Sequence, residues 1–331
     1  GRAVACGINQ SGQRNIPLLD KGVTYTQVSA GRDHTAFLRS DGRVVACGEN
    51  AFGQCDIPPL DEGMSYIQVS AGEHHTVLLR SDGCAVACGE NRDGELDIPL
   101  LEKGVSYVQV SAYDRHTVFL RSDGRAVACG MNTDGQCDIP PLDEGVSYIQ
   151  VSAGSVHTVL LRSDGTATAC GGGPYEFGQC VILHEDEATV DGVSYIQVSA
   201  GGEHTVILKS DGSAVAFGGN DCRQCNIPSL EMGMSYSQIS AGMHHTVLLR
   251  SDGSAVACGN DEFGQCTIPA LDPEISYAQA SAGAAHTVLL RSDGTAVAIG
   301  QNLDGRCRIP PLDRGITYTQ ISAGGCHTVL L

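Results

Sequence analysis

The chain has 331 residues, enough for one large domain or for two to three smaller ones. Glycine is abundant (42 residues), charged residues make up only 18% and tryptophan is absent, a composition typical of many short strands and tight turns and not of long helices. The 20 basic and 38 acidic residues give a formal net charge of −18, which argues against nucleic acid or an anionic membrane as the main partner, because phosphate binding uses clustered lysine and arginine.

A repeated unit runs through the chain and decides its fold. The pair His-Thr recurs every 41 residues, as from His34 to His75, with one interval of 47 between His157 and His204. The eight pairs begin at His34, His75, His116, His157, His204, His245, His286 and His327. A Tyr-x-Gln marker precedes each pair, first at Tyr25 and last at Tyr318. The long interval comes from an insertion near residues 172–191.

Each unit predicts strands and no helix. In the second unit, residues 65–71 alternate polar and apolar side chains with the period of two that indicates a strand. Residues 75–79 and 85–88 are almost continuous apolar runs, typical of strands covered on both faces. The Arg-Ser-Asp-Gly segment 80–83 joins them as a hairpin turn, and a Pro-Pro pair at 58–59 marks the connection between units. We therefore expect a three- or four-stranded antiparallel sheet per unit.

The two ends of the chain supply complementary parts of one unit. Residues 1–7 match residues 42–48, the second arm of the hairpin, whereas the chain stops at residues 327–331, which form the first arm. Because the small sheet of one unit cannot bury both of its faces alone, the units must stack on one another. We expect the first strand to complete the last unit and close a ring. The sequence predicts one all-β domain over residues 1–331, an eight-bladed β-propeller.

The unit resembles the RCC1 repeat. Its segments C-G-E-N-x-x-G-Q-C and S-A-G-x-x-H-T-V-L-L-R-S-D-G are similar to the family patterns W-G-x-N-x-x-G-Q-L and A-G-x-x-H-T-x-x-L-x-x-D-G. The resemblance covers essentially the whole chain, and the short repeats are also similar to those of the β-lactamase inhibitory propeller protein. Two features depart from the family: it generally forms seven blades, and its tryptophan is replaced here by cysteine, Phe217 or Ile299.

Neither catalysis nor metal binding is predicted. A residue in the same place in every blade is better explained by architecture, and a histidine at the start of a strand can tie its ring nitrogens to neighbouring backbone. His74 and His244 are additional histidines, but no cysteine or acid at zinc spacing accompanies them. No glycine-rich segment has the lysine of a phosphate loop. We expect a protein that is not an enzyme and has no cofactor.

The 15 cysteines recur mainly at two repeat positions, Ala-Cys-Gly and Gly-Gln-Cys. Phe217, Ile299 and Leu96 occupy these positions in other repeats, which indicates buried thiols acting as small apolar side chains. Disulfides between the two positions of one blade are the alternative. The cysteine content favours a reducing location, cytoplasmic or nuclear. We expect no membrane segment, because no run approaches the roughly 18–20 apolar residues of a span, and no signal peptide is recognisable.

Variation among the repeats is concentrated in the pair before each His-Thr and in the x-N-x-x segment after each Ala-Cys-Gly. Strand direction places both at one end of every blade, so they share one face of the ring, and loops on a rigid scaffold are common recognition sites. This face is richer in acids than in bases and offers aromatic anchors. The predicted partner-binding residues are Arg32, Asp33, Glu49, Phe52, Glu73, His74, Glu90, Arg92, Asp93, Tyr113, Asp114, Arg115, Asp134, Tyr175, Glu176, Phe177, Glu203, Asp261, Glu262, Phe263 and Asp304. The alternative is that exposed loops vary because nothing constrains them.

Three functions of different classes follow. The first is a monomeric, non-catalytic scaffold for a basic or amphipathic protein partner, as a segment of a larger HERC-like protein or on its own. The second, implied by the resemblance, is a guanine-nucleotide exchange factor for a small GTPase. The third is an enzyme inhibitor of the β-lactamase-inhibitory type, which is normally secreted and fits poorly with fifteen cysteines.

Overall fold

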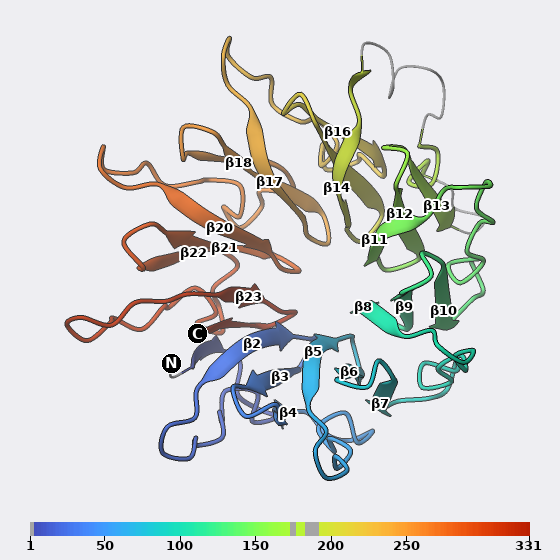
Figure 1. The fold of residues 1–331 in the computed structure, drawn as a ribbon. Coiled ribbons are helices and arrows are strands. Elements are labelled where there is room, and N and C mark those ends of the chain that lie inside the picture. Colours follow the sequence, from blue (N-terminus) through green and yellow to red (C-terminus); the bar gives the residue numbers. More distant parts are fainter. Residues whose placement is uncertain (1–2, 173–176, 183–191) are drawn as a thin grey trace.

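The chain is described by a computed structural model that covers residues 3–172, 177–182 and 192–331. These residues form eight sheets of three antiparallel strands each, arranged as the blades of a propeller (Figure 1). The eight-bladed fold is therefore confirmed, with three strands in each blade.

The first strands of neighbouring blades contact one another all the way around the ring and so line its axis. These inner strands are β2 (Tyr25–Ala30), β5 (Tyr66–Ala71), β8 (Tyr107–Tyr113), β11 (Tyr148–Ala153), β14 (Tyr195–Ala200), β17 (Tyr236–Ala241), β20 (Tyr277–Ala282) and β23 (Ile321–Ala323). The middle strands are β3 (His34–Arg39), β6 (His75–Arg80), β9 (His116–Arg121), β12 (His157–Arg162), β15 (His204–Lys209), β18 (His245–Arg250), β21 (His286–Arg291) and β24 (His327–Leu330). The outer strands are β4 (Val44–Gly48), β7 (Ala85–Gly89), β10 (Ala126–Gly130), β13 (Ala167–Gly171), β16 (Ala214–Gly218), β19 (Ala255–Gly259), β22 (Ala296–Gly300) and β1 (Val4–Gly7).

The ring closes as the complementary chain ends predict. β1 pairs with β24, and β24 pairs with β23, so the last blade combines strands from both ends of the chain. Figure 1 shows the two termini side by side in the blade between β2 and β20. This pairing joins the two ends of the chain in one blade and so closes the ring.

The hydrophobic core lies between the blades. In one interface, Val77 and Leu79 of β6 pack with Tyr107 and Val110 of β8, and similar clusters fill the spaces between the other blades. The middle strands are buried along almost their whole length, which explains their continuous apolar sequence. Each blade therefore depends on its neighbours for burial.

Three hydrogen-bonded contacts repeat at every interface. The Gln68 amide accepts from the Val110 backbone N–H at 3.1 Å and donates to its carbonyl at 3.0 Å, and the Ser70 hydroxyl accepts from the Ala112 N–H at 2.9 Å. The acceptor bonds of these Gln and Ser side chains are present at all eight interfaces. They form two closed circles of hydrogen bonds around the inner strands.

The repeated histidine forms the third contact. His34 Nε2 lies 2.8 Å from the hydroxyl oxygen of Thr76 in the next blade, and the same bond joins every pair of neighbours. The Thr76 hydroxyl donates to the Gln54 carbonyl at 2.8 Å, so its oxygen accepts a hydrogen bond from the Nε2–H of His34. Burial lowers the pKa of His34 to about 3, which fits this neutral tautomer. The prediction of a structural histidine is consistent with this contact. The sequence predicted that the ring nitrogens bond neighbouring backbone, whereas Nε2 bonds a threonine hydroxyl of the next blade.

In the described part of the chain, no two cysteines are joined by a disulfide. Many of the repeat cysteines are half-buried, so they are less enclosed than the sequence predicts. Their thiols also donate to carbonyl oxygens, as Cys55 Sγ does to Glu49 at 3.3 Å. The disulfide alternative has no support in the structure.

Candidate interaction face

The two variable segments of each blade lie together, as strand direction predicts. His34 pairs with Gly48 at the same end of β3 and β4, and the Glu49 N–H donates to the Asp33 carbonyl at 2.9 Å. The equivalent bond in the next blade joins Glu90 to His74. We call this end of the ring, formed by residues 32–33, 49–52 and their equivalents, the loop face. The opposite end, with the Ser-Asp-Gly hairpin turns, is the turn face.

Similar hydrogen bonds brace the outer loops of the loop face in several of the described blades. Asn50 Oδ1 accepts from the Cys55 N–H at 2.8 Å, while its Nδ2 donates to Asp56 Oδ1 at 2.8 Å. The buried Gln54 accepts from the Phe52 N–H at 3.0 Å. Equivalent bonds are made by Asn132 and Gln136. The loops therefore present differing side chains on a fixed frame.

Charged residues of the first three blades form a connected cluster on the loop face. Glu73 contacts Arg32, His74 Nε2 at 3.7 Å and Arg115 Nε at 3.8 Å. Arg115 also contacts Asp93 at 3.6 Å. Much of the acidic charge predicted for a basic partner is therefore neutralised within the protein in this part of the face.

An aromatic and cationic stack adjoins this cluster. The Phe52 ring lies 5.1 Å from the His74 ring, and the Arg92 guanidinium lies 5.2 Å from the Phe52 centroid. Arg92 Nε also contacts Glu90 at 3.0 Å, and His74 Nδ1 contacts Glu49 at 3.4 Å. Phe52 thus packs against neighbouring side chains of the loop face.

Two predicted contact residues are not well placed to meet a partner. Glu90 is only 6% exposed and its carboxylate is used by Arg92. Tyr113 ends β8 and packs against the core beside Ala153, and burial raises its pKa to about 12. Asp114 is half-buried, and burial raises its pKa. Tyr175 and Glu176 lie outside the described residues.

The remaining predicted residues are at least partly accessible. Exposed positions are Arg32, Arg92, Asp93, Arg115, Phe177, Asp261, Glu262, Phe263 and Asp304, and half-buried ones are Asp33, Glu49, Phe52, Glu73, His74, Asp134 and Glu203. Asp261 carries out the structural function of Asn50, because its Oδ1 accepts from the Cys266 N–H at 2.8 Å. Asp304 is paired with the buried Arg306 at 2.8 Å.

Sequence reasoning missed two exposed apolar residues on the loop face. Met243 and Leu303 occupy the variable segments of the sixth and seventh blades and are 42% and 86% exposed. With Phe263, they give this part of the face an apolar surface. The signal was an apolar side chain at positions that are polar or small in most other repeats.

The described residues contain no group of three or more His, Cys, Asp or Glu side chains arranged to hold a metal ion. In the same residues, no helix has the length and apolarity of a membrane span.

Five stretches of the chain match the family model for the "Regulator of chromosome condensation (RCC1) repeat": residues 25–54, 66–95, 107–136, 195–224 and 236–265. Each stretch runs from the tyrosine of an inner strand to the buried glutamine or glutamate of an outer loop. No curated protein sequence matches the chain significantly.

Solved structures share the fold at low sequence identity. Prp20p of Saccharomyces cerevisiae, described together with its binding properties to Gsp1p and histones, has a TM-score of 0.65 and 17% identity, over 99% of this chain and 90% of that chain. Human WBSCR16 has a TM-score of 0.64 and 17% identity, over 100% of this chain and 99% of that chain. The CRINKLY WD40 ectodomain of the Arabidopsis thaliana receptor kinase ACR4 has a TM-score of 0.61 and 19% identity, over 88% of this chain and 100% of that chain. Such identities establish the fold alone.

Proposed function

We propose that this β-propeller, in which five stretches match the RCC1 repeat, is a non-catalytic scaffold whose loop face binds a protein partner. The observation that carries the proposal is the contrast within each loop. Asn50, Gln54 and their equivalents fix the backbone by the same hydrogen bonds, whereas the neighbouring accessible side chains differ from blade to blade. Rigid presentation of varied side chains is what recognition loops require.

The partner surface is centred on the sixth and seventh blades. Met243, Phe263 and Leu303 are exposed there beside Glu262, whereas the acids near Glu73 are already paired with arginines. An apolar anchor with acidic neighbours suits an amphipathic partner that carries basic residues. The location proposed for this interaction is intracellular, and the propeller acts as a monomer.

The test is affinity capture with immobilised protein, followed by identification and reconstitution of the bound partner. In the variant Phe263→Ala/Leu303→Ser, the affinity for the partner is expected to fall at least roughly tenfold, which corresponds to a loss of about 1.4 kcal/mol of binding free energy. Glu90→Gln is the matched control, because this side chain is buried on the same face. Equal binding by the double variant and the wild type would exclude this surface.

The exchange-factor and inhibitor functions stay predictions of the sequence, because no specific contact in the structure favours either of them. Release of labelled nucleotide from purified small GTPases is the measurement that separates an exchange factor from a scaffold.

A further inference from the structure

An arc of exposed aliphatic residues lies at the turn face, at the end of the ring opposite the loop face. Ile67, Val108, Ile149 and Ile196 are 51–53% exposed and follow the first tyrosine of four consecutive inner strands, β5, β8, β11 and β14. We call these four residues the aliphatic arc. The other four blades carry small or polar residues here: Thr26, Ser237, Ala278 and Thr319.

A local irregularity of the inner strands brings these side chains to the surface. Tyr66 pairs with Arg80 beside the hairpin turn, and the register shifts between Tyr66 and Gln68, with Ile67 between them. The same shift occurs after Tyr148 and Tyr195. A bulge of this kind re-aims a side chain. Ile67 is therefore exposed, whereas strict alternation would have placed it with the buried Val69.

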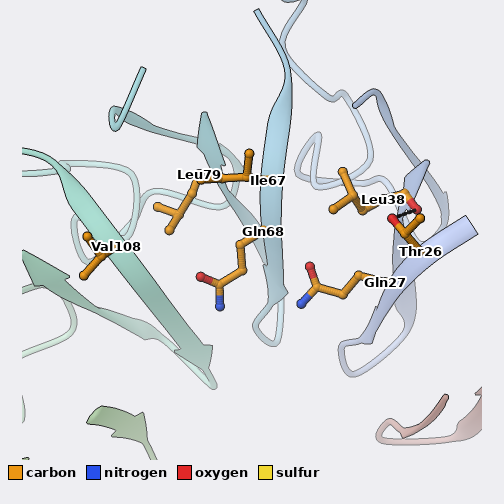
Figure 2. Close-up of a pocket in the computed structure, with 7 residues that line it drawn as sticks. All are labelled: Thr26, Gln27, Leu38, Ile67, Gln68, Leu79 and Val108. Atoms are coloured by element: carbon orange, nitrogen blue, oxygen red, sulfur yellow. Dashed lines mark hydrogen bonds between the residues drawn. The ribbon is translucent and has the colours of Figure 1, made fainter. Parts of the chain in front are cut away.

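The arc borders a concave surface. Ile67 and Val108 line an open hollow of about 480 Å³, together with Leu79 and the side chains of the first blade (Figure 2). The Gln68 amide in its wall is held by the Val110 backbone. The hollow thus has an apolar side formed by neighbouring blades and a polar wall that contains the Gln68 amide.

The charges around the arc are arranged with acids outward. At three consecutive blades, Arg80, Arg121 and Arg162 are only 8–19% exposed, while their partners Asp61, Glu102 and Asp143 are 67–79% exposed. The covered arginines hold the carboxylates in place, and the carboxylates face solvent. Lys103 and Arg125 are the exposed bases near the middle pair. We call Asp61, Glu102 and Asp143 the rim. These three carboxylates provide separate negative charges near the aliphatic arc.

We propose that the aliphatic arc is a second docking surface, which binds a basic amphipathic segment of a protein partner. The apolar side chains of the bound segment pack against Ile67, Val108, Ile149 and Ile196. The lysines or arginines of the same segment contact the carboxylates of the rim. A second copy of this chain is a poor occupant, because a two-fold contact would bring two acidic rims together in a protein of net charge −18. This surface is separate from the loop face and does not depend on the function proposed there.

The test uses substitutions that the chain itself accepts. In Ile67→Thr/Val108→Thr/Ile149→Thr/Ile196→Thr, every changed blade receives the residue that the first and last blades already carry, Thr26 and Thr319. The probe is a fluorescent peptide of Leu and Lys with one apolar helical face, measured by anisotropy at low salt. We expect the affinity to fall at least roughly tenfold. The control variant Leu18→Ser removes an exposed apolar side chain outside both proposed surfaces and is expected to bind as the wild type does.

Two further peptides examine the chemistry of the partner. A peptide of the same composition without an apolar face, and one with Glu in place of Lys, are both expected to bind weakly. Equal binding of the scrambled peptide, or unchanged binding by the arc variant, overturns the proposal. So does a wild-type dimer in sedimentation that the arc variant abolishes, because a second copy would then cover the arc.

A measurement on the unmodified protein covers the case in which the arc variant is unstable. The same Leu-Lys peptide with a photo-crosslinking group is expected to label residues 65–69 and their equivalents in blades three to five. Labelling confined to the loop face overturns the docking site.

Discussion

His327 Nε2 lies 2.7 Å from the hydroxyl oxygen of Thr35, and this bond joins the last blade to the first. It is chemically the same as the bond between His34 and Thr76, which joins two blades that are consecutive in the chain. Residues 8–24 connect β1 of the last blade to β2 of the first, as residues 49–65 connect β4 to β5, so this closing interface has the same chain connectivity and the same histidine–threonine contact as the others.

Removing one threonine hydroxyl is expected to destabilise the ring. Thr76→Val leaves the buried Nε2–H of His34 without an acceptor, which costs about 1–3 kcal/mol of unfolding free energy. Urea unfolding followed by circular dichroism measures this loss. Thr35→Val is the matched variant at the closing interface and should cost about the same. A loss below about 0.5 kcal/mol in both variants would show that the bond contributes little.

Acid is expected to unfold the propeller at a higher pH than its carboxylates require. Burial lowers the pKa of His34, His116, His157, His204 and His286 to about 3, from the usual 6.5, and that of His75, His245 and His327 to about 4. Between pH 6.5 and these values the unfolded chain binds more protons than the folded one, so stability falls as the pH falls.

The measurement is the unfolding free energy at a series of pH values between 7 and about 4, where most histidines of the unfolded chain become protonated. Because eight histidines act together, unfolding at low urea is expected before pH 4 is reached. Stability that is independent of pH over this interval would contradict neutral burial of the histidines.

Arg223 is expected to be a strained residue whose replacement stabilises the protein. Its φ angle is 68°, and among the described residues other than glycine no other φ is positive. The equivalent position in other repeats is glycine, as at Gly53 with φ of 81°. Because a left-handed conformation costs an ordinary residue roughly 1 kcal/mol, Arg223→Gly should raise the unfolding free energy by about that amount. Thermal unfolding checks the shift, and Arg223→Ala, which keeps a Cβ atom, should not give the same gain.

The cysteines are expected to react with thiol reagents at very different rates. Burial raises the pKa of Cys47, Cys88 and Cys129 to about 12, so these thiols are protonated and slow. Cys84 is exposed on a hairpin turn. Titration of the native protein with a chromogenic disulfide at pH 8 should show a fast phase that Cys84→Ser removes. A fast phase unchanged in this variant would assign the reactivity elsewhere.

The fold could be predicted because the same pattern of strands and turns occurs eight times in the sequence. Tyr25, His34 and their equivalents fix the blade boundaries, and the match of residues 1–7 to residues 42–48 predicts the closing strand that β1 supplies. The common loop face also followed from strand direction. These inferences need only local sequence patterns and the spacing of the repeats along the chain.

Contacts between blades were harder to predict. The partner of His34 is Thr76, which lies in another blade, so the adjacent His and Thr of one repeat gave no direct indication of the bond. Glu90 is buried and pairs with Arg92 at 3.0 Å, a side-chain arrangement that composition does not reveal. Exposure of Ile67 depends on the register shift beside Tyr66, which the alternating sequence conceals.

The pairing of β1 with β24 has a mechanical consequence. The strands are antiparallel, and Val4 lies opposite Leu330, at the end of the pair where both chain termini emerge. A force that pulls the two termini apart therefore loads the Val4–Leu330 pair first and separates the others in succession towards Gly7 and His327, as a zipper opens. Single-molecule pulling from the termini should open the ring at low force, whereas handles placed at Gly7 and Leu330 would load the same four pairs in shear and give a higher rupture force.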